Sequence, residues 1–196
     1  MQDFNDAAAI IQEGGVGVLP TDTLYGLVGS ALMPDTVDRI YKLKERNSLK
    51  PLIVLISDIA QLEQFGIELS EALVEQLESY WPHGGAEEGD TSAGESGAYS
   101  IILPTLDDQF EYLSRNTDTI AFRLPDNNEL RELIRATGPI VAPSANPEGF
   151  PPAITVDAAK KYFGTDVDFY VDGGDLSGKP STILVLDDDE IKVVRG

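Results

Sequence analysis

The sequence contains no cysteine and a single histidine, His83, and both scarcities limit the chemistry that the protein can perform. Without cysteine, disulfide bonds, Cys-ligated zinc and thiolate catalysis are excluded. With one histidine, a metal site built from several histidines cannot form. His83 lies in a polar stretch, so we interpret it as a solvated loop residue rather than a catalytic base. A catalytic site in this chain must therefore work mainly with other residue types.

Long apolar runs are also missing, which indicates a globular protein without a membrane partner. The first fifteen residues carry no basic residue ahead of their apolar part, unlike a signal or transit peptide. We therefore expect a cytoplasmic location. The length of 196 residues suits one domain with a core of ordinary size.

Basic residues are few: 14 Lys and Arg stand against 34 Asp and Glu, for a formal net charge of −20. Such a charge disfavours a broad nucleic-acid interface, because affinity for phosphate backbones comes from Lys and Arg, and we expect weak or no direct binding of nucleic acid. Five of the basic residues fall within residues 39–50, whereas none occurs between 51 and 114. This cluster favours a pocket for a small anion, and the alternative is a solvated helix face.

Apolar segments alternate with amphipathic ones, which predicts a single α/β domain whose sheet is covered by helices. The expected strands are residues 16–19, 51–56, 99–104, 119–125, 138–143, 168–174 and 181–186, the last opening a hairpin around three aspartates. The expected helices are residues 5–13, 34–44, 57–65 capped by Ser57, 70–80 capped by Ser70, 107–114, 127–137 and 155–163.

Three loops have the same organisation, in which an apolar run gives way to hydroxyls, amides or glycines. They are "VLPTDT", "VAPSAN" and "VDGGDLSGKPST". Ligands of open α/β sheets bind beyond the carboxyl ends of the strands, so we expect the three loops to converge on one crevice. Their hydroxyls and N–H groups suit phosphate or carboxylate oxygens. None has the P-loop pattern, and for any one loop a turn that satisfies its own backbone is the alternative.

Arg123 lies inside the apolar strand "IAFRLP", where an unpaired charge is unfavourable. It therefore needs an anionic partner, either a ligand in the crevice or the carboxylate of a structural salt bridge. Arg195, next to the end of the sequence, is either a second ligand of an anion or a solvated residue.

Seven segments, in this order and spacing, resemble the motifs of the YrdC-like family, the threonylcarbamoyl-AMP synthases. They are "LPTDTLYGL", "KLKERNSLKPLIVLI", "YWP", "DTIAFRLP", "GPIVAPSANPEG", "DGGDLSGKPSTIL" and "IKVVRG". The resemblance implies a twisted, mixed α/β sheet around a concave cleft. It also implies an enzyme that converts L-threonine, bicarbonate or CO2, and ATP into threonylcarbamoyl-AMP and pyrophosphate. The product serves N6-threonylcarbamoylation of adenosine 37 of tRNA.

Carried over position by position, the resemblance implies three sets of residues. L-Threonine would contact Thr23, Arg123, Ala142 and Ser181. ATP would contact Arg46, Lys50, Thr119, Ser144, Pro152 and Arg195. The family's catalytic Lys, Arg, Ser and Asn set, expected near the phosphates, corresponds to Lys44, Arg46, Ser144 and Asn146.

The same resemblance implies that Mg2+ is held through the ATP phosphates and water, with no metal ligands from the protein. The carbamate of threonine is already a nucleophile, so positioning and charge neutralisation would carry catalysis without His or Cys. Arg195 would help to cover the site. The product would pass transiently to a separate transferase complex.

The chain departs from the family pattern at a few positions. Residues 83–96 form a polar insertion after "YWP", so that Ser100 takes the place of the family's Thr. Asn47, Leu55 and Glu148 replace Pro, a His of some members, and Ser. We interpret the insertion as a flexible loop that the fold tolerates, because loop closure entropy grows slowly with length.

Three other functions remain open from the sequence. The first is an RNA- or ribosome-binding module of the same fold, which the net charge disfavours. The second is a domain that handles carbamoyl phosphate, whose usual zinc-finger companions are absent. The third is a homologue inactivated by the insertion at 83–96.

Overall fold

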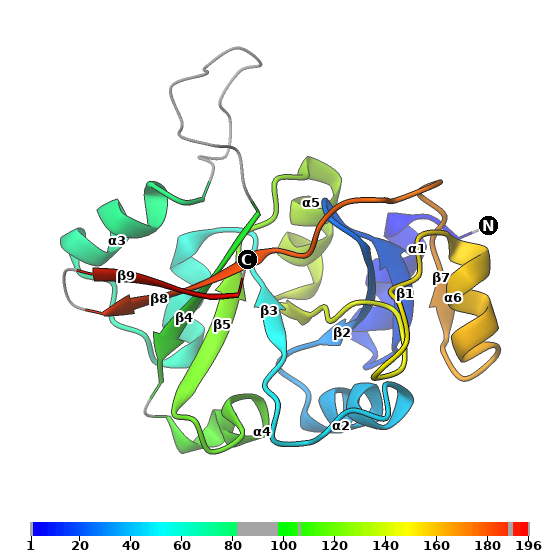
Figure 1. The fold of residues 1–196 in the computed structure, drawn as a ribbon, viewed down its shortest axis with the longest axis horizontal. Coiled ribbons are helices and arrows are strands. Elements are labelled where there is room, and N and C mark those ends of the chain that lie inside the picture. Colours follow the sequence, from blue (N-terminus) through cyan, green and yellow to red (C-terminus); the bar gives the residue numbers. More distant parts are fainter. Residues whose placement is uncertain (1, 82–97, 106, 188–189, 196) are drawn as a thin grey trace, which may run out of the picture.

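The computed structural model describes residues 2–81, 98–105, 107–187 and 190–195, and Figure 1 shows the arrangement of its elements. The described strands form one mixed sheet in the order β7-β1-β2-β6-β3-β5-β4-β8-β9. The expected insertion at 83–96, with His83, falls outside the described residues. Among the helices of the described ranges, none has the length and apolar character needed to cross a membrane.

The helices and strands have the following bounds. The helices are α1 (Phe4–Gln12), α2 (Pro34–Leu43), α3 (Glu71–Glu78), α4 (Glu111–Ser114), α5 (Asn128–Thr137) and α6 (Val156–Phe163), with 3-10 helices at Ile59–Phe65 (η1) and Asp108–Phe110 (η2). The strands are β1 (Gly17–Pro20), β2 (Tyr25–Ser30), β3 (Ile53–Leu55), β4 (Tyr99–Pro104), β5 (Thr119–Arg123), β6 (Ile140–Val141), β7 (Phe169–Tyr170), β8 (Thr182–Asp187) and β9 (Glu190–Arg195).

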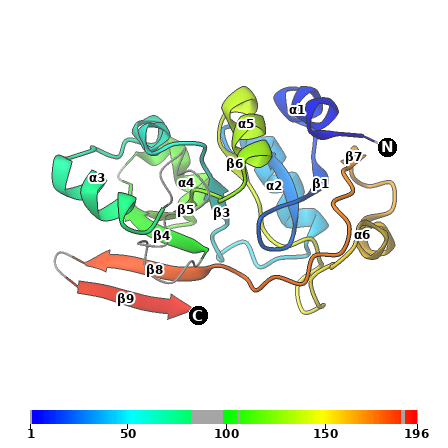
Figure 2. The same ribbon diagram turned by 90° about the horizontal axis from the view of Figure 1, so that it is seen from above.

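Successive side chains of a strand point to opposite sides of the sheet, and in the central strands both sets are buried. Val18 of β1 packs in the larger of two apolar cores, and Leu19 packs in the smaller one. The smaller core lies under α1 and α5, which run side by side along one face, as Figure 2 shows. Helices α2 and α6 contribute to the larger core. The sequence prediction of a helix-covered α/β sheet is confirmed.

Strand β2 is absent from the elements that the sequence predicts. Two glycines within it, Gly26 and Gly29, give it the composition of a turn. A Cβ at Gly29 would lie 2.5 Å from Thr36 Cγ2, so this position must be glycine for α2 to lie against the strand. Close helix packing therefore explains why a glycine-containing segment is a central strand.

The predicted cap of the helix at 57–65 is wrong. The segment forms the 3-10 helix η1, which begins after Asp58, and that residue makes no side-chain capping bond. Instead, the Ser57 backbone N–H donates a hydrogen bond to Gln61 Oε1 at 2.7 Å, and the Ser57 hydroxyl donates to the Asp58 carboxylate. The Ser70 cap of α3 is confirmed, since its hydroxyl accepts a hydrogen bond from the Leu73 N–H.

The predicted final hairpin is confirmed as the antiparallel pair of β8 and β9. Strand β8 also pairs in parallel with β4, which joins the hairpin to the rest of the sheet. Two of the three aspartates of the turn, residues 188 and 189, fall outside the described residues.

Candidate active site

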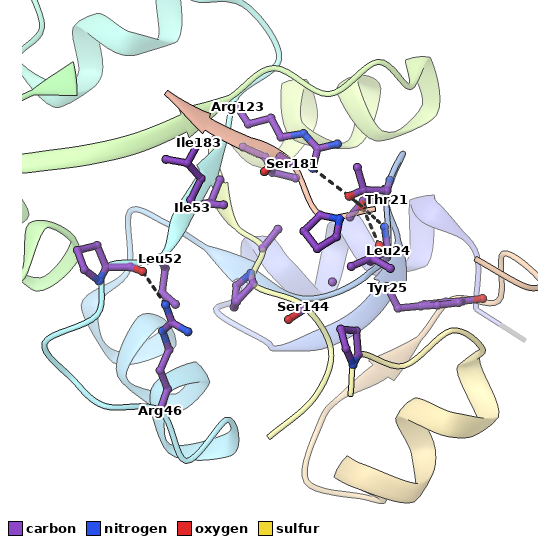
Figure 3. A pocket seen from close by; sticks show the side chains of 18 residues that line it. Thr21, Leu24, Tyr25, Arg46, Leu52, Ile53, Arg123, Ser144, Ser181 and Ile183 are labelled. Atoms are coloured by element: carbon purple, nitrogen blue, oxygen red, sulfur yellow. Dashed lines mark hydrogen bonds between the residues drawn. The ribbon is translucent and has the colours of Figure 1, made fainter. Parts of the chain in front are cut away.

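A cavity of about 170 Å3 opens where the three predicted loops meet, as Figure 3 shows. It is lined by Thr21, Thr23, Leu24, Tyr25, Gly26, Arg46, Pro51, Leu52, Ile53, Leu55, Arg123, Ala142, Pro143, Ser144, Pro152, Pro180, Ser181 and Ile183. Strands β1 and β7 are parallel, and both β1 and β6 are antiparallel to β2. The carboxyl ends of β1, β6 and β7 therefore point the same way, and the predicted convergence of the loops is confirmed.

The first loop is a tight turn organised by Thr21. The Thr21 hydroxyl donates to the Leu24 carbonyl at 2.7 Å and accepts from the N–H groups of Thr23 and Leu24 at 3.2 Å each. Such local bonding is typical of turns that follow a strand. Thr21 thus shapes the turn, whereas Thr23 presents its hydroxyl to a partner across the cavity.

That partner is Arg123, whose Nη1 donates to Thr23 Oγ1 at 3.0 Å. The guanidinium also forms an ion pair with Asp22, whose second oxygen accepts the Asp126 N–H at 3.0 Å. Arg123 is 5% exposed, and its Nε is buried without a hydrogen-bond partner. The salt bridge that the sequence left open is therefore present, and Arg123 also lines the cavity.

Lys44 and Asn146 lie beneath the second loop and do not belong to the cavity lining. Lys44 is 2% exposed, and its Nζ donates to the carbonyl oxygens of Ser144 and Asn146 at 2.5 and 2.7 Å. Burial, with a contribution from Arg46, lowers the pKa of Lys44 to about 8. Asn146 Nδ2 in turn donates to the carbonyls of Pro147 and Phe150. In this structure the two residues stabilise the loop that presents Ser144 to the cavity.

The basic residues of 39–50 do not gather in one pocket. Arg46 lines the cavity and donates to the carbonyls of Lys50 and Pro51 at 3.2 and 3.1 Å. Lys50 is exposed and forms an ion pair with Glu148, and this pairing holds the pKa of the Glu148 carboxyl below its usual value. Arg39 is bound to Asp168 at 2.6 Å. Of the cluster, only Arg46 reaches the lining.

Ser181, Ala142 and Pro152 lie in the lining as the resemblance implies. The hydroxyls of Ser181 and Ser100 are 2.8 Å apart and both residues are buried. The Ala142 N–H donates to the Ile53 carbonyl of the sheet at 3.1 Å. Ser100, the replacement for the family's Thr, thus supports a residue of the cavity wall.

Thr119 is not brought into the lining. Thr119 begins β5, four residues before Arg123, which corresponds to about 13 Å along a strand. Its hydroxyl is 3.0 Å from that of Thr117. Arg195 ends β9 and pairs through its backbone with Ile183, a residue of the cavity wall. The Arg195 side chain is not among the described parts of the structure.

Tyr25 and Gly178 support the cavity and were missed from the sequence. The Tyr25 hydroxyl donates to the Gly174 carbonyl at 2.8 Å and accepts the Gly173 N–H at 2.9 Å, which fixes the start of the third loop. A Cβ on Gly178 would lie 2.2 Å from the Thr23 carbonyl oxygen. The third loop therefore lies directly on the first, and the glycine in "LSGKPS" is the only sequence signal of this contact.

The described lining contains two arginines and no carboxylate, although the chain has a net charge of −20. Threonine and serine hydroxyls add neutral hydrogen-bonding groups. Across the described ranges, no group of three His, Asp or Glu residues is placed to hold a metal ion. The electrostatics of the described lining thus favour an anionic ligand.

Comparison with known proteins identifies the family of the chain. The Sua5/YciO/YrdC family model, described as telomere recombination, matches residues 9–196. The threonylcarbamoyl-AMP synthase of Bacillus subtilis is 36% identical over 186 residues, which cover 93% of this chain and 50% of that protein. The synthase of Pseudomonas paraeruginosa is 32% identical, over 92% of this chain and 90% of that protein.

Among solved structures, Pyrococcus abyssi Sua5 complexed with L-threonine superposes with a TM-score of 0.82 at 29% identity. The match covers 98% of this chain and 53% of that one. The chain thus spans about half of two relatives and nearly all of a third. On the family match and on these identities, the chain belongs to the Sua5/YciO/YrdC family.

Proposed function

We propose that the protein is a threonylcarbamoyl-AMP synthase that joins L-threonine, bicarbonate or CO2, and ATP, and releases pyrophosphate. The observation that carries this proposal is the cavity itself, which offers two arginines at different parts of its wall and no carboxylate among its described lining residues. Two separate cations suit a reaction that brings two anionic groups together. The names of the relatives support the identity of the substrates.

In this proposal the threonine carboxylate binds at the Arg123 end of the cavity. Arg123 has a buried Nε without a partner, and Thr23 beside it presents a hydroxyl. Ser181 and the backbone at Ala142 complete this end of the wall. A guanidinium and several hydroxyls can together hold a carboxylate and the threonine side chain.

The ATP phosphates bind at the Arg46 end, with Ser144 and Pro152 on the adjoining wall. Lys50 joins them once its exposed ion pair with Glu148 opens. Contact with Thr119 requires that ATP extend beyond the cavity, since this residue is not part of the lining. Arg195, at the end of β9, is a further proposed contact of ATP. Lys44 and Asn146 contribute by holding the loop of Ser144 in place.

The chemistry requires little covalent help from the protein. The threonine amine adds to CO2 and loses a proton, and an oxygen of the resulting carbamate attacks the α-phosphorus of ATP as the bond to pyrophosphate breaks. Mg2+, bound through phosphate oxygens, would supply charge neutralisation at the leaving group. The residues of this chain orient the two substrates and balance their negative charge, which agrees with a cavity wall whose described residues include no histidine.

We further propose that the product passes transiently to a separate tRNA-modifying transferase and that the reaction takes place in the cytoplasm. The acidic net charge of −20 supports an enzyme that acts on free threonine rather than one that holds tRNA itself.

The test is pyrophosphate release from ATP with Mg2+ and bicarbonate, each substrate being omitted in turn, together with a variant that lacks residues 83–96. Release that depends on threonine in the full chain supports the proposal. Release from the shortened variant alone would show that the insertion inactivates the protein. No release from either folded protein would contradict the synthase and favour the binding-module alternative.

A further inference from the structure

The two arginines of the cavity differ in the charge of their partners. Arg46 donates to two backbone carbonyl oxygens, those of Lys50 and Pro51, which are neutral. Arg123 forms an ion pair with Asp22. The positive charge is therefore balanced inside the protein at the Arg123 end, whereas at the Arg46 end no acidic side chain of the described residues pairs directly with the guanidinium.

The surrounding charges increase this difference. Around Arg46 the described cations are Lys42, Lys44, Lys50 and Arg115, and the described acids are Asp38, Glu45 and Glu148, so that with Arg46 itself the described cations exceed the acids. Behind Asp22 lies Asp126, which is itself paired with Arg131 at 3.1 Å and adds no net charge. The Arg46 end is therefore electropositive, and the Arg123 end is close to neutral.

Asp22 is also held in place. Its side chain is 11% exposed, so solvent screens its charge only weakly. One carboxylate oxygen faces Arg123 and the other accepts the Asp126 N–H at 3.0 Å. Asp22 does not line the cavity, so its effect on a ligand must come from its charge and from its hold on Arg123 rather than from direct contact.

We propose that Asp22 is a specificity-determining residue that, through Arg123, reserves this end of the cavity for a zwitterion and excludes phosphate-like anions. Threonine arrives with an ammonium group beside its carboxylate and leaves the local charge at the Arg123 end balanced, whereas the negative carbamate that forms later on its nitrogen has to be neutralised at the Arg46 end. A phosphate or sulfate would place a second uncompensated anion close to the buried Asp22 carboxylate. The inference rests on the proposed function in taking threonine and ATP as the ligands of the two ends of the cavity.

The test uses inorganic sulfate as the probe at constant ionic strength. In the wild-type protein, sulfate should compete with ATP and not with threonine. In Asp22→Asn, which keeps the shape and removes the charge, sulfate should also compete with threonine, with an inhibition constant lower by about tenfold or more. Asp22→Glu, which keeps the charge, should retain the wild-type pattern.

Asp168→Asn is a matched control outside the cavity. Asp168 also pairs with an arginine, Arg39, and also accepts a backbone N–H, that of Val16 at 2.8 Å. The control should leave the inhibition pattern unchanged. The proposal would be overturned if sulfate competed with threonine equally well in the wild type and in Asp22→Asn. It would also be overturned if Asp168→Asn changed the competition as much as Asp22→Asn does.

Calorimetry with sulfate separates this inference from the proposed function, because it needs no turnover. Asp22→Asn should gain a sulfate site that the double variant Asp22→Asn/Arg123→Met lacks. The double variant removes both charges of the ion pair, so no unpaired buried charge disturbs its folding. If Asp22→Asn gains a sulfate site while the protein shows no synthase activity, the result would support the role of Asp22 and contradict the proposed synthase. Absence of any gain would overturn the role of Asp22 even in an active enzyme.

Discussion

Arg123 Nη1 donates a hydrogen bond to Thr23 Oγ1 at 3.0 Å, although 100 positions of the chain separate the two residues. The contact joins the carboxyl end of β5 to the turn after β1, and it defines one end of the cavity. Arg46, from the segment after α2, lines another part of the wall, as Figure 3 shows. The two arginines should therefore serve different substrates.

Arg123→Ala should raise the KM for threonine about 10- to 100-fold with little change in the KM for ATP, because charge-assisted hydrogen bonds to a carboxylate are lost. Arg46→Ala should have the converse effect. Steady-state kinetics with each substrate varied in turn measure both constants. Equal effects of either variant on both substrates would contradict the division of the cavity.

Gly178→Ala should reduce kcat/KM for threonine about tenfold or more. The new Cβ would lie 2.2 Å from the Thr23 carbonyl oxygen, so the third loop would have to move away from the first. Ser177→Ala, one residue earlier in the same exposed segment, is the matched control and should behave as wild type. Wild-type kinetics in Gly178→Ala would show that the contact between the loops does not shape the site.

Lys44 gives a pH dependence of stability whose sign follows from its pKa of about 8. Between pH 8 and about 10.4, the usual lysine value, the unfolded chain keeps the proton that the folded protein has lost, so the free energy of unfolding should rise with pH. The gain attributable to Lys44 is of the order of 3 kcal/mol across that window. A neutral amine still donates to the carbonyls of Ser144 and Asn146, so the loop contact persists.

Denaturant unfolding of the wild type and of Lys44→Met at several pH values measures this contribution as a difference. Lys42→Met is the control, because Lys42 is exposed on the same helix. A difference between wild type and Lys44→Met that stays constant from pH 7 to about 10 would refute the lowered pKa.

Glu148→Ser should lower the KM for ATP a few-fold and leave the KM for threonine unchanged, because Lys50 loses the carboxylate that competes for its charge. The effect should shrink as salt is added, since both side chains are partly exposed. Glu132→Ser breaks another exposed ion pair, that with Arg135, away from the cavity. An ATP requirement that is unchanged at low salt, or equally changed by Glu132→Ser, would count against this role of Glu148.

Patterns that depend on local chemistry could be predicted from the sequence. Apolar runs predicted the strands that are buried on both faces of the sheet. The change from apolar residues to hydroxyls after Pro20 and Val141 predicted two of the loops that form the cavity wall. The pairing of Arg123 with an anionic group followed from its position in an apolar strand.

Features that depend on tertiary packing could not be predicted. Gly29 makes β2 look like a turn until α2 is placed against it. Lys44 belongs to a basic cluster in the sequence, yet it turns inward to two carbonyls about a hundred positions away. Sequence spacing alone does not distinguish a lysine that binds a ligand from one that binds the backbone.

The most direct test of the central claim uses radiolabelled bicarbonate with ATP, Mg2+ and the wild-type protein, with or without L-threonine. The account predicts a labelled adenylate that forms only when threonine is present, together with an equal amount of pyrophosphate. Pyrophosphate released without threonine, or no labelled nucleotide from the folded protein, would contradict it.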